Sequence, residues 1–168
     1  IWAELFVAVM GASNYLFAEA VASQELASRV MAHAHAFEAM GAVPEIVVCD
    51  NLRSGVRSAH RYEPEINATY QEMAAHYGVA VIPARAGKPR DKAKVEAGVL
   101  LAERWILARL RNRRFYSLAE ANSEIAGLVA WLNDRPFKKM PGSRRELFEE
   151  LERPVMRPLP GDRYEFAT

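Results

Sequence analysis

The sequence predicts an α/β fold in which a mixed β-sheet is flanked by helices. An apolar hairpin pattern comes first in the chain, and two strand–helix–strand units follow it. Crossovers of that kind place strands in parallel with a helix on the sheet face. The composition agrees with a globular protein, because 51% of the 168 residues are apolar and 26% are charged. This balance excludes a disordered tail, a collagen-like repeat and a disulfide scaffold.

The first fifty residues predict a hairpin, a helix and a buried strand. Residues 5–10 and 15–21 are β-rich runs around a Gly/Ser/Asn turn, which is the pattern of an antiparallel hairpin. Residues 23–41 predict a helix with one apolar stripe, ended by its terminal glycine. Residues 46–49 form a continuous apolar run, typical of a parallel strand that is buried on both faces.

The middle of the chain predicts a second crossover and a long helix. Residues 52–64 are polar and irregular, and residues 66–77 predict a helix. Residues 79–82 predict another short buried strand. A helix is expected over 89–110, because Pro89 suits a first turn and an apolar stripe follows. The stripe consists of Val95, Val99, Ala102 and Ile106.

The last fifty residues predict two more helices and a strand. Capping-box patterns begin at Ser117 and Ser143, each with a glutamate three residues later. The helices that they start are expected to end near Asn133 and Glu152. Residues 164–166 resemble the beginning of a strand.

Basic side chains are concentrated in one segment, although the formal net charge is only +1. Residues 1–50 hold one base and six acids, whereas residues 85–114 hold ten bases and three acids, a local charge of +7. A polyanion responds to the local charge rather than to the total. The near-neutral total therefore does not exclude a nucleic-acid partner.

Cysteine content and hydropathy exclude several classes of protein. The single cysteine, Cys49, forms neither an internal disulfide nor a zinc site, which favours a reducing, cytoplasmic compartment. We expect Cys49 in the core rather than as a nucleophile. The sequence has no apolar run of about 18 residues and no Gly-rich phosphate loop. It therefore predicts neither a membrane-spanning helix nor a P-loop ATP site.

Two carboxylates have positions compatible with metal-dependent chemistry. Asp50 follows the strand predicted at 46–49, at the edge where α/β sheets bind ligands, although a turn-capping role is an equal alternative. Glu96 lies about two turns into the basic helix and by itself suggests a solvent-facing ion pair with Lys92. Together, a strand-end Asp and a helical Glu can converge on Mg²⁺, and two such ions serve phosphoryl transfer.

Motifs around these carboxylates resemble a known family. Residues 47–51 (Val-Val-Cys-Asp-Asn) resemble the Asp-Asn strand end of the retroviral-integrase superfamily, and residues 87–96 resemble its Gly/Lys-rich approach to a catalytic Glu. The chain is closer still to IstA-like transposases of insertion-sequence family 21. Residues 6–20 resemble their second and third strands, and residues 131–133 and 141–148 resemble their post-core segment. The resemblance covers nearly the whole chain.

The resemblance implies a ribonuclease-H-like fold and an Asp-Asp-Glu polynucleotidyl transferase, which cuts transposon ends and joins them to target DNA. It assigns Asp50 as the second acid and Glu96 as the third, holding two Mg²⁺ (or Mn²⁺) ions in the complete site. The first Asp belongs to a strand before the hairpin, so we expect a chain truncated upstream that is inactive alone. The expected domains are a catalytic core over 1–137 and, over 138–168, a helical linker with the start of a carboxy-terminal β-domain.

Cations near the expected metal site are candidate DNA contacts. They are Lys88, Arg90, Lys92 and Lys94 before Glu96, and Arg53 beside Asp50. Such contacts with phosphates position a duplex rather than read its sequence. A second cluster, from Arg109 to Arg114, fits a solvated helix end equally well. The resemblance further implies transposon-end and target DNA as ligands, a homo-multimer and an ATPase helper protein.

Two alternatives stay open at this point. A nuclease of the same fold would act on an RNA–DNA hybrid, although the post-core segment argues against it. A truncated or degenerate copy would act only as a DNA-binding or subunit-interaction module. The transposase hypothesis places the protein in the bacterial cytoplasm, associated with the nucleoid when it acts.

Overall fold

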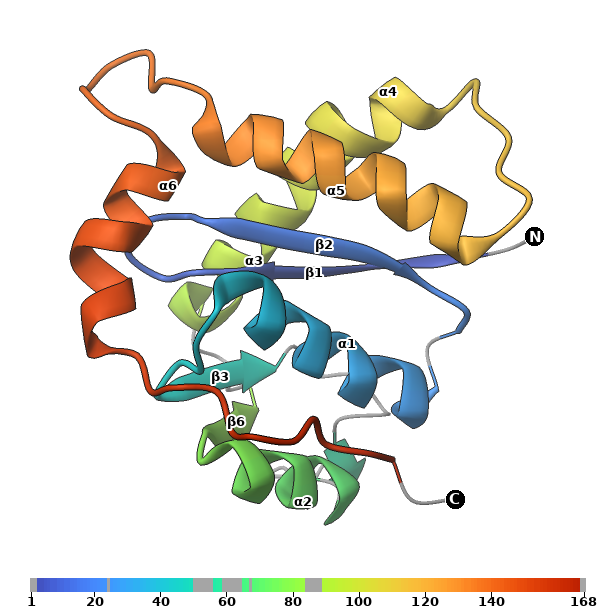
Figure 1. Ribbon diagram of the computed structural model, residues 1–168, viewed down its shortest axis with the longest axis vertical. Coiled ribbons are helices and arrows are strands. Elements are labelled where there is room, and N and C mark those ends of the chain that lie inside the picture. The colour runs from blue at the N-terminus through green and yellow to red at the C-terminus, as the bar shows by residue number, and fades with distance from the viewer. Residues whose placement is uncertain are drawn as a thin grey trace. The chain divides into compact units, whose positions relative to one another are not determined.

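The computed structural model describes residues 3–23, 25–49, 56–58, 65–66, 68–83 and 89–166, without the side chains of 56–58, 65–66 and 89–92. The chain divides into two compact units, each built from segments that are distant in the sequence (Figure 1). Unit 1 comprises residues 1–23 and 94–155, and unit 2 comprises residues 24–93 and 156–168. Each unit has a hydrophobic core of its own.

Unit 1 begins with the predicted β-hairpin. Strands β1 (Glu4–Val9) and β2 (Leu16–Val21) pair antiparallel, with Val9 opposite Leu16. Asn14 takes a left-handed conformation in the turn (φ 61°), which its short polar side chain tolerates. Alternate residues of β2 enter the core of unit 1, because the side chains of a strand alternate between its faces.

Helix α5 (Leu118–Asp134) runs along the edge of β2 that β1 leaves unpaired (Figure 1). Asn133 accepts a hydrogen bond from the Leu16 N–H (2.9 Å) and donates one to the Leu16 carbonyl (2.8 Å). Asn122 bonds to Ala20 in the same way, at 2.6 Å and 3.0 Å. Side-chain amides of the helix therefore satisfy backbone groups that a neighbouring strand would otherwise pair.

Both predicted capping boxes begin helices. The Ser117 hydroxyl accepts from the Glu120 N–H at 3.1 Å, and the Ser143 hydroxyl accepts from the Glu146 N–H at 3.2 Å. The second helical segment is continuous and consists of α6 (Arg144–Leu147), the π-helical turn η2 (Phe148–Glu152) and the 3-10 turn η3 (Arg153–Val155). It lies within unit 1, and the domain boundary predicted after residue 137 stays a prediction.

Glu152 ties the end of this segment to the hairpin turn. Its carboxylate accepts hydrogen bonds from the Ala12 N–H (3.1 Å) and the Ser13 N–H (3.2 Å), and the residue is 9% exposed. One turn earlier, Phe148 stacks on Tyr15 with ring centroids 4.3 Å apart. These contacts fix the turn between β1 and β2, since hydrogen bonds to a carboxylate are stronger than neutral ones.

We expect Glu152→Ala to lower the free energy of unfolding of unit 1 by about 1–3 kcal/mol, because two amides of the turn lose a charged acceptor. Urea unfolding measures the change. Glu149→Ala is the matched control, because Glu149 is exposed on the same helical segment. Equal stability of the two variants would contradict the role given to Glu152.

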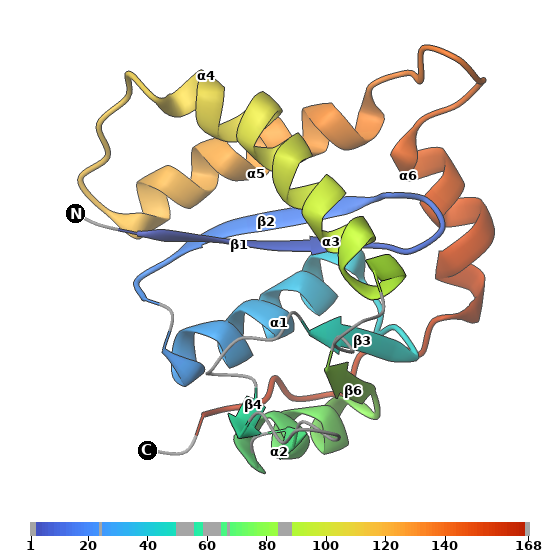
Figure 2. The same ribbon diagram turned by 180° about the vertical axis from the view of Figure 1, so that it is seen from behind.

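A long helical segment packs against the hairpin within unit 1 (Figure 2). It runs without a break through α3 (Pro89–Ala102), the π-helical turn η1 (Glu103–Leu107) and α4 (Ala108–Leu110), as predicted. Ala102 and Ile106 are fully buried, whereas Val99 is 37% exposed, so the predicted stripe is wrong at Val99. Gly98 faces the hairpin instead, because a Cβ there would lie 3.1 Å from the Val9 side chain.

Unit 2 contains both predicted crossover helices and a parallel strand pair. Its elements are α1 (Leu26–Met40), β3 (Ile46–Cys49), β4 (Val56–Ser58), β5 (Glu65–Ile66), α2 (Ala68–Tyr77) and β6 (Ala80–Pro83). Strand β3 is parallel to β6, and β4 forms a small antiparallel pair with β5. Gly41 ends α1 in the left-handed conformation expected of a terminating glycine (φ 74°). Strand β4 corrects the prediction that 52–64 is irregular throughout.

Strands β3 and β6 are buried on one face only, so the prediction of two buried faces is wrong. Ile46, Val48 and Ile82 share a face and are 51%, 44% and 42% exposed. The opposite face, with Val47 and Val81, packs against the core that α1 and α2 complete. A continuous apolar run cannot distinguish a strand covered on one face from a strand covered on both.

The last described residues complete the core of unit 2 instead of forming the predicted strand. Arg157 and Val43 exchange backbone hydrogen bonds at 2.8 Å and 2.9 Å. Tyr164 is 9% exposed within the core of unit 2, and its N–H donates to the Tyr77 hydroxyl at 3.1 Å. The backbone of 163–166 pairs with no strand in the described part of the chain, so the predicted strand is wrong.

His33 makes the stability of unit 2 depend on pH. It is 7% exposed on α1, donates from Nδ1 to the Arg29 carbonyl at 2.7 Å and packs edge-on against Tyr70. Burial lowers the pKa of His33 from 6.5 to about 4. As the pH falls, His33 is protonated near pH 6.5 in the unfolded chain but only near pH 4 in the folded chain. We therefore expect the full free energy of unfolding above about pH 6.5 and a loss of about 3 kcal/mol as the pH falls to about 4.

Urea unfolding over this pH range measures the effect of His33. His33→Leu is expected to flatten the profile between pH 6.5 and 4, because the titrating group is gone. A flat profile in the unsubstituted chain would contradict the prediction.

Candidate active site

Glu96 presents an exposed carboxylate from α3. It lies in the part of α3 that belongs to unit 1, and no described side chain pairs with it. A carboxylate oxygen is the kind of ligand that a hard cation prefers. The ion pair with Lys92 is not tested, because the Lys92 side chain lies outside the described residues.

Asp50 lies outside the described residues, and so do Arg53 and Lys88. The structure does describe the strand that leads to Asp50. Cys49, the last residue of β3, is opposite Pro83, the last residue of β6, in the parallel register. The two strands that precede Asp50 and α3 in the chain thus end side by side at the carboxyl edge of this sheet. The predicted Asp50–Glu96 pair stays a prediction.

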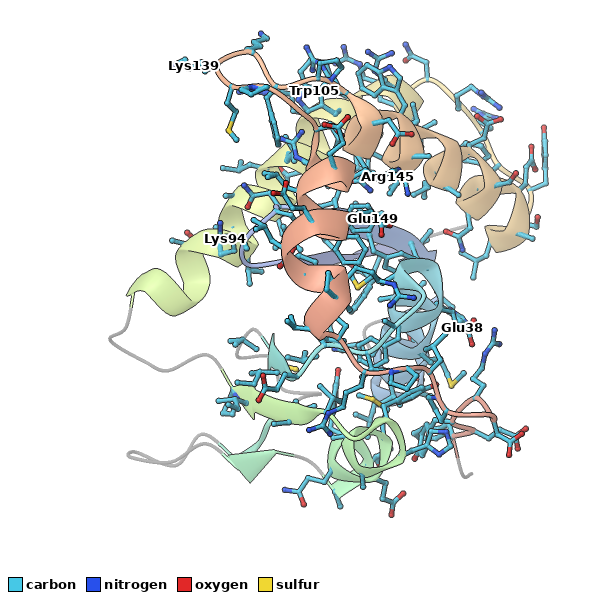
Figure 3. All side chains as sticks on the ribbon, turned by 60° about the vertical axis from the view of Figure 1, so that its left-hand side comes forward. Glu38, Lys94, Trp105, Lys139, Arg145 and Glu149 are labelled. Atoms are coloured by element: carbon cyan, nitrogen blue, oxygen red, sulfur yellow. The ribbon has the colours of Figure 1, made fainter. Side chains whose placement is uncertain are left out.

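Among the candidate DNA contacts near the expected metal site, Lys94 is the one whose side chain the structure describes. Its Nζ donates to the Asn14 Oδ1 at 2.9 Å, which joins α3 to the hairpin turn (Figure 3). Lys94 and Glu96 are two residues apart, so they point to different sides of the helix. Arg90 and Lys92 lie on the first turns of α3, and their side chains are not described.

A metal centre is not assembled from the described residues alone. Among them, no group of three or more His, Cys, Asp or Glu side chains could hold a metal ion. Asp50, one of the two expected ligands, is outside that set. The donor chemistry of the expected pair fits a hard divalent cation, because both ligands are carboxylates and one of them, Glu96, is exposed without a described partner.

The sequence analysis did not identify an arginine–tryptophan cluster that the structure shows in unit 1. Trp105 is only half-buried and lies 5.7 Å from Trp131 between ring centroids, and Leu107 is 42% exposed. Arg109 and Arg135 lie over these two rings. Each arginine follows a tryptophan by four residues in the sequence, Arg135 as the residue directly after α5, and that spacing could have revealed the cluster.

Known proteins match the chain over almost its whole length. A protein assigned as the transposase of insertion sequence IS408, from Burkholderia multivorans, is 54% identical over 166 residues, which are 99% of this chain and 32% of that protein. A protein assigned as the transposase of insertion sequence IS1162, from Pseudomonas fluorescens, is 47% identical over 99% of this chain and 30% of that protein. The chain is a relative of insertion-sequence transposases. This confirms the resemblance expected from the motifs.

The transposase relationship rests on the sequence matches, since no family model matches the chain. The chain spans about a third of the length of these transposase relatives. No helix in the described part of the chain is long and apolar enough to cross a bilayer.

The fold of this transposase relative is that of an integrase catalytic core. The crystal structure of the catalytic core domain of BIV integrase matches with a TM-score of 0.64, covering 88% of this chain and 86% of that domain at 13% sequence identity. The match confirms the predicted ribonuclease-H-like α/β fold. At that identity it shows the fold alone.

Proposed function

We propose that the chain is the catalytic-core segment of a DNA transposase, which cuts phosphodiesters at transposon ends and joins those ends to target DNA. The observation that supports it is the combination of 54% identity to a transposase relative with the fold of an integrase core. Either finding alone is compatible with other functions, because one fold hosts many chemistries. The two together point to polynucleotidyl transfer.

In this proposal Asp50 and Glu96 hold divalent metal, Mg²⁺ or Mn²⁺, together with a third acid. Bound ions would supply the activated nucleophile and the charge stabilisation that phosphodiester transfer needs. The protein's part is to place the two carboxylates and the DNA. The parallel register of Cys49 and Pro83 supports this placement, because the strands that precede Asp50 and α3 end side by side.

We assign DNA positioning to the cations around this site, Lys88, Arg90, Lys92, Lys94 and Arg53. The described member, Lys94, already bonds to Asn14 of the hairpin turn. A lysine held in this way can meet a phosphate with less loss of side-chain entropy than a free one. We also propose assembly as a homo-multimer on DNA. The ATPase helper stays a prediction from the resemblance.

A joining assay tests the proposed function. The complete reading frame that contains these residues is incubated with Mg²⁺, labelled DNA of a transposon end and a supercoiled target. We expect the label to enter the target, since strand transfer forms a new phosphodiester. Cleavage of an RNA–DNA hybrid without joining would instead favour the nuclease, and DNA binding without either product would favour the degenerate copy.

A further inference from the structure

Arg109, Arg135 and Arg144 of unit 1 each lie over an aromatic ring. The guanidinium carbon of Arg109 lies 4.5 Å from the centroid of Trp131, and that of Arg135 lies 4.2 Å from the centroid of Trp105. Arg144, which begins α6, lies 5.6 Å from the Phe137 ring. We call Arg109, Arg135, Arg144 and these three rings the arginine–aromatic cluster. A guanidinium over the face of a ring is attracted by the negative face of the ring's quadrupole.

None of the three arginines has a carboxylate partner among the described side chains. Other arginines of the same unit do have one, since Arg113 pairs with Glu124 and Arg145 pairs with Asp134. Arg113 and Arg145 also lie over rings, those of Phe115 and Tyr15, so the lack of a described carboxylate partner is what distinguishes the arginines of the cluster. The arginines of the cluster keep their charge without a protein anion.

Arg144 also has an unsatisfied donor. Its Nε is buried and has no hydrogen-bond partner among the described residues. Burial and repulsion from Arg135 together lower the pKa of the Arg144 guanidinium. Two like charges that repel each other near a buried orphan donor are unfavourable in the free protein, and an anion that bridges them would remove the conflict.

The surroundings of the cluster are also cationic. Lys138 and Lys139 lie exposed in the loop that joins Arg135 to Arg144, and no described acid pairs with either. Figure 3 shows Lys139 extending from this loop into solvent, with Trp105 at the same end of unit 1. The three arginines of the cluster and these two lysines together make five cations in this part of unit 1.

We propose that the arginine–aromatic cluster binds the phosphodiester backbone of duplex DNA. A guanidinium whose face rests on a ring still presents its N–H edge, which matches the paired oxygens of a phosphate. Both tryptophan rings are covered by arginines, so base stacking on them is disfavoured. Contacts to phosphates carry no sequence information, and this surface therefore holds DNA of any sequence.

The proposed contact extends the proposed function but is separate from its chemistry. Trp105 follows Glu96 by nine residues on one continuous helical segment, which separates them by about 13 Å along the axis. The cluster would therefore contact the DNA duplex at a distance from the phosphodiester that reacts. Binding here needs neither metal nor catalysis, so the two proposals can fail independently.

The test measures binding of a labelled duplex of arbitrary sequence by fluorescence anisotropy over a range of salt concentrations, without divalent metal. The triple variant Arg109→Gln, Arg135→Gln, Arg144→Gln is expected to lower the slope of log affinity against log salt by about 2–3. At about 0.1 M salt we expect its affinity to fall by about 10–100-fold. Trp131→Leu, which keeps the charge but removes a supporting ring, should lower affinity about threefold or more.

The matched control is Arg113→Gln, Arg145→Gln, Arg163→Gln, which removes the same charge from arginines that already have carboxylate partners. It should change the salt slope by less than about 1. Equal losses in both triple variants would overturn the proposal, because charge alone would explain them. Unchanged DNA binding by the Arg109, Arg135 and Arg144 triple variant would also overturn the proposal. If that variant also sediments differently from the unsubstituted protein, the surface contacts another protein chain instead of DNA.

Discussion

Glu96→Gln is expected to lower the rate of DNA strand transfer by at least about 1000-fold, equal to about 4 kcal/mol of activation free energy. Glutamine keeps the shape of the side chain but removes the charge and one of the metal-binding oxygens. Glu96 is exposed and has no described partner, so the substitution should not disturb folding. DNA binding without metal should stay within about twofold, because the phosphate contacts dominate affinity. The measurement is the joining assay with Mg²⁺.

Glu103→Gln is the matched control for Glu96. Glu103 is also exposed and lies on the same continuous helical segment, but the proposal gives it no metal. It should retain strand transfer within about threefold. Asp50→Asn should behave like Glu96→Gln. Full activity of either site variant would remove that carboxylate from the proposed catalytic site.

Asn133→Ala should be among the most destabilising single changes in unit 1, with a loss of about 3 kcal/mol of unfolding free energy. Asn133 is 1% exposed, so its removal leaves the N–H and the carbonyl of Leu16 buried without partners. Water cannot readily replace the amide at a site with so little exposure. Urea unfolding measures the change.

Asn122→Ala provides an internal comparison. Asn122 makes the same pair of hydrogen bonds to β2, at Ala20, but it is half-buried. Water can reach the freed groups there, and we expect a loss of about 1 kcal/mol. A larger loss at Asn122 than at Asn133 would show that burial does not decide the cost.

Local chemistry predicted most elements of this fold. Gly41 ends α1, and Ser117 and Ser143 begin helices. These residues were predictable because each acts on backbone groups within a few residues of itself. The bonds from Asn122 and Asn133 to β2 join residues more than one hundred positions apart. No local sequence pattern predicts such contacts. No local pattern predicts the burial of Tyr164 either.

The motifs of the candidate site are contiguous in the sequence, and the site itself stays a prediction. The residues around Asp50 and Glu96 form two short motifs, and these were enough to name the family that the relatives confirm. The arginine–aromatic cluster was missed because it joins three helices, although the spacing of Trp131 and Arg135 is visible in the sequence. Exposure of Val48 and Ile82 could not be predicted, because burial depends on what covers a strand.

The order in which the chain builds its two units has a consequence for synthesis. Unit 2 starts at residue 24 but takes its last core residue, Tyr164, from the carboxy-terminal segment. All of the second part of unit 1, residues 94–155, is translated in between. During synthesis unit 2 must therefore wait with an incomplete core until unit 1 has been translated. A released chain that ends at residue 155 would contain every segment of unit 1, whereas the core of unit 2 would lack Tyr164.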